Sequence, residues 1–75
     1  MNKARRQQLR KWLQDLEEIK YELESIRSDE EDYFDNMPEN LQGGRRGMQA
    51  EDAIDEMDDA ISSLEDAINS VERIV

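Results

Sequence analysis

The sequence contains neither cysteine nor histidine. Without cysteine the chain forms no disulfide and offers no thiolate to a metal ion or a substrate. Without histidine it lacks the commonest general base and the commonest transition-metal ligand. The five serines have no candidate base beside them, so none is set up as a nucleophile. We therefore expect a protein that is not an enzyme and that uses no cofactor and no metal site.

Long apolar runs are also missing, and the N-terminal residues include none. We therefore expect no signal peptide and no membrane interaction, and a soluble cytoplasmic protein. Seventy-five residues make a single small domain. A chain of this size rarely builds a sufficient core by itself, so it usually needs staples or a partner.

Acidic residues outnumber basic ones by 20 to 10, giving a net charge of −10. The first 11 residues carry five basic side chains and no acid, so residues 12–75 hold the other 5 bases and all 20 acids, a net charge of −15. Phosphates would repel that acidic body, so we expect no direct contact with duplex nucleic acid. The basic segment is formed by Lys3, Arg5, Arg6, Arg10 and Lys11.

Two heptad patterns dominate the chain, one in each half. Apolar residues spaced four and three apart predict two helices packed along a supercoiled seam. We expect helix 1 over about residues 3–35, a connector over about 36–47 that contains Pro38 and all three glycines, and helix 2 over about 48–73. Gly43 and Gly44 are expected to turn the chain with left-handed backbone angles.

Both heptads are centred on Gly43 and Gly44, which predicts an antiparallel coiled-coil hairpin within an all-α fold. Its flanking columns would pair Lys20 with Glu65 and Arg27 with Asp58, and opposite charges there favour this orientation. The seam predicted for helix 1 has one polar intruder, Glu30. Its members are Leu16, Leu23, Met37 and the column Trp12, Ile19, Ile26 and Tyr33; the seam of helix 2 is Ala50, Ile54, Met57, Ile61, Leu64, Ile68, Val71 and Val75.

Helix 2 is apolar over a wider face than one partner helix covers, because a third column of small or apolar residues runs beside its seam. A three-in-seven apolar face usually packs against more than one helix. We therefore expect two hairpins to close a four-helix bundle as a homodimer. The alternative is that the single partner helix half-covers this column. The predicted interface comprises Ala53, Ala60, Ala67 and Ile74, with Leu13 and Phe34 from helix 1.

Charged clusters suggest other roles. The acids at 29–32 lack the spacing of an EF-hand loop, so we interpret them as a solvated helix face rather than a cation site. Long acid rows on helix 2 would suit an inhibitor that mimics nucleic acid and blocks a basic groove. The basic segment would suit an adaptor that binds an acidic target, or it is an ordinary frayed terminus.

The segment Tyr33–Gly43, YFDNMPENLQG, with the acidic, alanine-spaced helix after it, resembles small uncharacterised proteins of phages and mobile elements of Gram-positive bacteria. The similarity covers residues 29–70 and leaves out the basic segment. It implies kinship and assigns no activity or ligand. Together with the composition, it leads us to expect a small acidic accessory protein that acts through protein–protein interaction.

Overall fold

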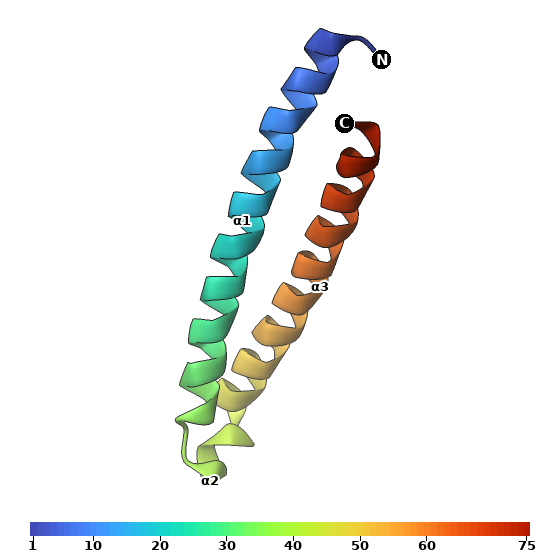
Figure 1. Cartoon of the computed structure of the whole chain (residues 1–75). Coiled ribbons are helices and arrows are strands. Elements are labelled where there is room, and N and C mark those ends of the chain that lie inside the picture. Colours follow the sequence, from blue (N-terminus) through green and yellow to red (C-terminus); the bar gives the residue numbers. More distant parts are fainter.

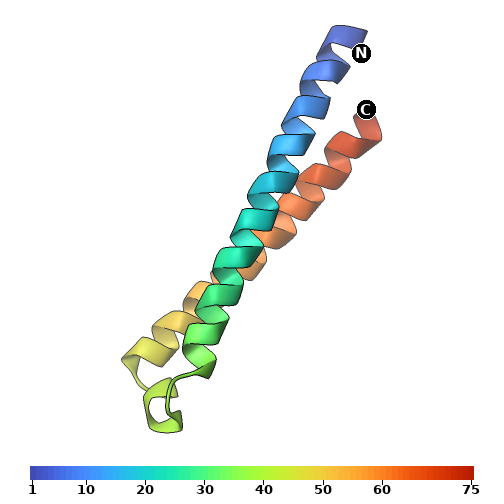
Figure 2. The same ribbon diagram turned by 60° about the vertical axis from the view of Figure 1, so that its left-hand side comes forward.

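The computed structural model describes residues 1–75 and is an all-helical hairpin. Helices α1 (Lys3–Asp35) and α3 (Arg45–Ile74) lie side by side and antiparallel, joined by the short helix α2 (Glu39–Gln42) (Figures 1 and 2). The molecule is a rod of 58 × 14 × 13 Å, with α2 at one end and both termini near the other. The all-α fold with two long packed helices is as the sequence predicted.

Helix α1 runs for 33 residues without an interior glycine or proline. Its start is fixed by Asn2, whose side-chain oxygen accepts a hydrogen bond of 2.9 Å from the backbone N–H of Arg5. This N-cap satisfies one of the amides that a helix leaves unpaired. The helix stops at Asp35, shortly before Pro38, whose ring disfavours helical angles in the residue before it.

The connector packs more tightly than the sequence suggested. The side-chain amide of Gln42 donates a hydrogen bond of 3.1 Å to the carbonyl oxygen of Phe34, which ties α2 back to the end of α1. Helix α3 begins at Arg45, at the early end of the range from Arg45 to Met48 that the sequence allowed, and its N-cap is Gly44. No glycine has a positive φ, so the expected left-handed turn at Gly43 and Gly44 is wrong.

Gly47 is needed for a different reason, the close approach of two backbone segments. It is buried at the start of α3, and a Cβ atom there would overlap the backbone carbonyl of Gln42. A Cβ at Gly43 would meet nothing within 4 Å. The connector can therefore fold against α3 only because residue 47 has no side chain.

The seam between the long helices is as predicted on α3 and different on α1. All eight residues predicted for the seam of the second long helix are buried or half-buried. On α1 the column Trp12, Ile19, Ile26 and Tyr33 was expected in the seam, and this is wrong: these side chains are 63%, 50%, 58% and 49% exposed. The half-buried residues of α1 are instead Leu9, Leu13, Leu16, Lys20, Leu23, Arg27, Glu30, Glu31 and Phe34, and Met37 just beyond the helix is half-buried as well.

The physical reason is a rotation of α1 about its own axis by about 50°, half of the 100° that separates successive residues. The rotation brings the column Leu13, Lys20, Arg27 and Phe34 into the seam. The alkyl stems of lysine and arginine cover apolar surface there while their charges reach outward. The Lys20 ammonium lies 3.3 Å from a Glu65 carboxylate oxygen, and the Arg27 Nε lies 2.6 Å from an Asp58 oxygen. Both pairs are those that the antiparallel register predicted.

The resulting core is thin. Only two hydrophobic residues are buried, Ala50 at 2% exposure and Ile68 at 7%. Single hairpins of this size bury too small a share of their apolar surface to offset the entropy of ordering 75 residues easily.

Substitution of Gly47 tests the close approach. Gly47→Ala should lower the free energy of unfolding by about 1–3 kcal/mol, because the methyl group forces the connector away from α3. The matched control, Gly43→Ala, has open space and should change it by less than about 1 kcal/mol. Urea melts followed by circular dichroism at one protein concentration measure both. Equal effects of the two substitutions would contradict the account of Gly47.

Candidate functional site

The most prominent surface feature is an apolar face that runs along both long helices. We use the term apolar face for two columns of residues seven apart, one on each helix. The α1 column is Trp12, Ile19, Ile26 and Tyr33, and the α3 column is Ala53, Ala60, Ala67 and Ile74.

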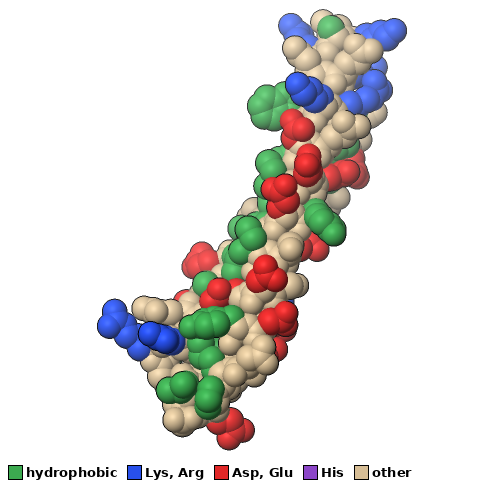
Figure 3. All heavy atoms as spheres, turned by 90° about the vertical axis from the view of Figure 1, so that its left-hand side faces the viewer, with side chains coloured by type: hydrophobic (Ala, Val, Ile, Leu, Met, Phe, Trp, Pro, Cys, Tyr) green, Lys and Arg blue, Asp and Glu red, His purple; other side chains and the backbone are tan.

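Both columns lie on the same side of the hairpin. The ion pairs Lys20–Glu65 and Arg27–Asp58 join one flank of α1 to the matching flank of α3. In an antiparallel pair each flank of one helix meets the equivalent flank of the other. The two apolar columns occupy the flank opposite the ion pairs on their own helices, so they form one continuous surface. In Figure 3 hydrophobic side chains follow one edge of the rod from the basic end to the connector.

Of the six residues predicted for the interface, four belong to this face. Ala60, Ala67 and Ile74 are exposed and Ala53 is half-buried. Leu13 and Phe34 do not belong to it, because the rotation of α1 places them in the hairpin seam, where both are half-buried. The α1 column is not recognisable as surface from the sequence, because Trp12, Ile19, Ile26 and Tyr33 have the spacing of a seam.

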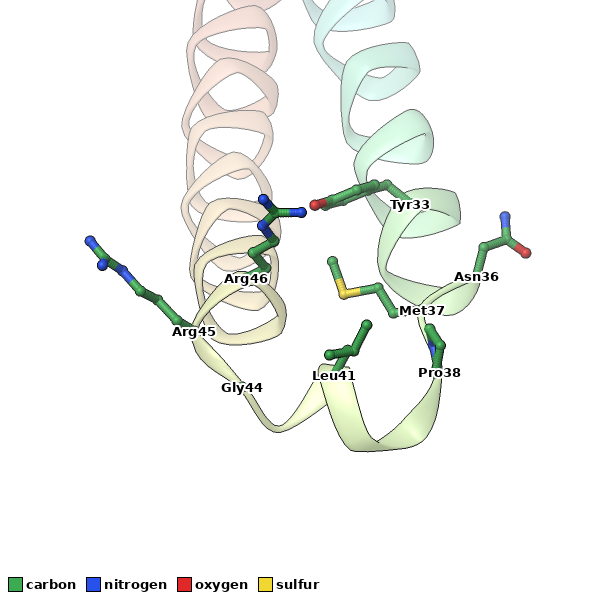
Figure 4. A pocket seen from close by; sticks show the side chains of 8 residues that line it. All are labelled: Tyr33, Asn36, Met37, Pro38, Leu41, Gly44, Arg45 and Arg46. Carbon is green, nitrogen blue, oxygen red and sulfur yellow. The ribbon is translucent and has the colours of Figure 1, made fainter.

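The connector end of the apolar face opens into a cavity of about 620 Å³. Its apolar lining comes from the end of α1, from α2 and from Met37 and Pro38 between these helices, and two arginines of α3 stand at its rim. In Figure 4 the side chains of Tyr33 and Arg46 point toward one another across its upper part, and Arg45 points away. The lining residues are Tyr33, Asn36, Met37, Pro38, Leu41, Gly44, Arg45 and Arg46.

The basic segment, Lys3, Arg5, Arg6, Arg10 and Lys11, extends beyond the end of α3 (Figure 1). All five side chains are exposed, and none takes part in an ion pair. No acidic residue stands in the first turn of α1, so this end combines five positive charges with the positive end of the helix dipole. This end of the rod therefore favours anions, as does the smaller basic pair Arg45 and Arg46 at the start of α3.

The flank opposite the apolar face is polar and paired. Hydrogen bonding to Asp58 raises the pKa of the Arg27 guanidinium, with further contributions from the charges of Asp58 and Glu31. Arg27 also bonds to Glu31 one turn along α1, and Lys20 lies 3.8 Å from Glu24. The acidic residues form no group of three or more that would hold a metal ion. No helix is both long enough and apolar enough to cross a membrane.

The chain matches no protein-family profile, no curated protein and no solved structure. The resemblance of residues 29–70 to phage and mobile-element proteins therefore stays a prediction from the sequence.

Charge exchange across the seam tests the ion pair between Lys20 of α1 and Glu65 of α3. Lys20→Glu and Glu65→Lys should each lower the melting temperature, because each places like charges across the seam. The double exchange should recover part of the loss, with a coupling of up to about 1 kcal/mol as for partly exposed pairs. A double-mutant cycle from thermal melts gives the coupling. Strictly additive losses would contradict it, and Ser62→Lys, an exposed site away from the pair, is the control.

Proposed function

We propose that this chain is a small non-catalytic interaction protein that works as a homodimer, with two hairpins closing a four-helix bundle through the apolar face. One observation carries the proposal: the large side chains of Trp12, Ile19, Ile26 and Tyr33 are about half exposed or more along one edge of the rod. Contiguous apolar surface of this kind marks a protein interface in water.

Dimerisation would also bury more apolar surface than the thin core of a single hairpin does. Covering a half-exposed isoleucine contributes on the order of 1 kcal/mol, given about 1.5–3 kcal/mol for burying the whole side chain. Several such residues on each copy would give the assembly a core that Ala50 and Ile68 alone do not provide. Small residues on α3 would let a helix of the second copy approach closely.

The remaining surfaces are available for a partner once the apolar face is covered. The adaptor function is supported by the basic segment, which is exposed and unpaired and projects past α3. In that function residues 3–11 bind an acidic target. This proposal makes the protein an accessory factor of a phage or mobile element, in keeping with the resemblance of residues 29–70, and a protein of the cytoplasm.

The alternative is an inhibitor that mimics nucleic acid. Exposed acids follow two adjacent columns of α3, turned away from the apolar face, and would present a rod of negative charge to a basic groove. These residues are Glu51, Asp52, Asp58, Asp59, Glu65, Asp66 and Glu72.

Sedimentation equilibrium tests the dimer. The wild-type chain should sediment at twice its 8.8 kDa mass. Ile26→Asp and Ala60→Glu should shift it toward the monomer and weaken dimerisation by roughly tenfold or more, because each buries a charge in the interface. Tyr21→Asp is the matched control, since Tyr21 is 75% exposed and lies off the apolar face. A wild-type monomer at about 100 µM, a concentration at which even micromolar dimers persist, would refute the dimer.

Affinity capture from lysate of the source cells separates the adaptor from the mimic. One bait replaces the five basic residues of the basic segment by glutamine, and a second replaces the exposed acids Asp52, Asp59 and Asp66, which form no ion pair, by asparagine. Loss of prey with the first bait alone is expected for an adaptor. Loss of a basic nucleic-acid-binding protein with the second bait alone would support the mimic and reject the adaptor. Circular dichroism must show that both baits keep their helices.

A further inference from the structure

We propose that the two hairpins pair with their rods pointing the same way, so that both basic segments project from one end of the dimer. This inference depends on the proposed homodimer and specifies how the second copy lies. A closed dimer has a twofold axis, and the apolar face allows two directions for it. The axis lies either along the rod, which we call the aligned dimer, or across it, which we call the opposed dimer. In both, neighbouring helices run antiparallel.

The aligned dimer places α1 of one copy on α3 of the other. A twofold axis along the rod keeps every residue at its own height, so no sliding is possible. The heights are fixed within one hairpin by the ion pairs Lys20–Glu65 and Arg27–Asp58. Ile19 is then level with Ala67 of the second copy, and Ile26 with Ala60. Trp12 and Tyr33 are level with Ile74 and Ala53. A large side chain meets alanine in three of the four layers, which suits interdigitated packing.

The opposed dimer places α1 on α1 and α3 on α3. When the apolar faces overlap fully, Ile19 meets Ile26 and Trp12 meets Tyr33, while Ala60 meets Ala67. Large residues then face large ones along one side of the bundle, and alanines face alanines along the other. The interaxial distance between packed helices depends on the size of the side chains between them. Two rigid hairpins would therefore need a large distance between their α1 helices and a small one between their α3 helices.

Charge at the edge of the face favours the same choice. Beside the α1 column runs an exposed acidic column, Asp15, Glu22 and Asp29. In the opposed dimer this column meets itself, with Glu22 beside its own copy and Asp15 beside Asp29. In the aligned dimer it meets the outer column of α3, where two of the three neighbours are Ser70 and Ser63 and only the third, Glu56, is acidic. Like charges therefore face each other in every layer of one arrangement and in one layer of the other.

The aligned dimer has one electrostatic cost, because it brings two segments of charge +5 to the same end. Their helices occupy diagonal corners of the bundle, so their axes stand about 11–14 Å apart for neighbours at 8–10 Å. That exceeds the Debye length of about 8–10 Å at 0.1–0.15 M salt, so the repulsion is largely screened. Nine residues of each α1 would project past the bundle by about 13 Å. The result is a cationic end with two arms, which an acidic partner would contact at two points.

Distances between spin labels on single cysteines test the orientation, and the absence of native cysteine makes each label unique. Gln7→Cys lies in the basic segment on the side away from the apolar face. In the aligned dimer its two labels should be about 25–35 Å apart, from the diagonal spacing and the helix radius. In the opposed dimer they should be more than about 45 Å apart, from the rise of 1.5 Å per residue.

Ser25→Cys is the control, because Ser25 lies outside the apolar face but near the height of its middle along the rod, and it gives a separation below about 35 Å in either arrangement. A short distance at both sites supports the aligned dimer. A short distance at Ser25→Cys with a long one at Gln7→Cys would overturn the aligned dimer and leave the proposed homodimer standing. No intermolecular distance at either site, at a concentration above the dissociation constant expected for a dimer, would overturn the homodimer itself.

Discussion

The pairing of Lys20 and Arg27 with acids of α3 determines how the rest of the surface is arranged. These two side chains lie between the helices, where their stems pack and their charges meet Glu65 and Asp58. A helix has one orientation about its axis, so turning this column into the seam turns another column out. The residues turned out are Trp12, Ile19, Ile26 and Tyr33, and they create the apolar face. An interaction on one flank of the hairpin thus decides what is exposed on the other.

The sequence predicted the two long helices, the connector and the antiparallel register because these depend on local and repetitive signals. Each of these signals has a single interpretation: the apolar spacing, the position of Pro38 and the order of charges at Lys20, Arg27, Asp58 and Glu65. The sequence does not determine the rotation of α1 about its axis in the same way, because two columns of α1 could fill the seam. The spacing of a seam is also found in a second column, Leu13, Lys20, Arg27 and Phe34. Because two of these residues are charged, apolar periodicity favours the wholly apolar column that begins at Trp12. The ion pairs Lys20–Glu65 and Arg27–Asp58 fit either column, so only the burial of the side chains in the folded hairpin decides between them.

The candidate site likewise has residues that the sequence pattern reveals and others whose place depends on three-dimensional packing. The alanine column of α3 was recognisable because it widens an apolar pattern beyond the needs of one partner helix. Leu13 and Phe34 were predicted to join it in the interface, and the rotation of α1, which was not predicted, leaves both half-buried in the hairpin seam. The requirement at Gly47 was out of reach as well: it depends on where the carbonyl of Gln42 comes to lie, and no local pattern contains that information. A glycine in a turn is usually expected because it can adopt left-handed backbone angles. At Gly47 glycine is needed instead because two backbone segments approach each other closely.

The distribution of charge fits a protein whose dimerisation and partner binding use separate surfaces. The apolar face carries almost no charge between Trp12 and Tyr33, so a second copy covers it without desolvating an ion. Acids occupy the outer faces, where they stay hydrated and discourage further association through the same helices. The five basic residues project beyond the region that a second copy would cover. Covering the apolar face therefore removes nothing from the basic end, and a homodimer presents that end to a partner unchanged.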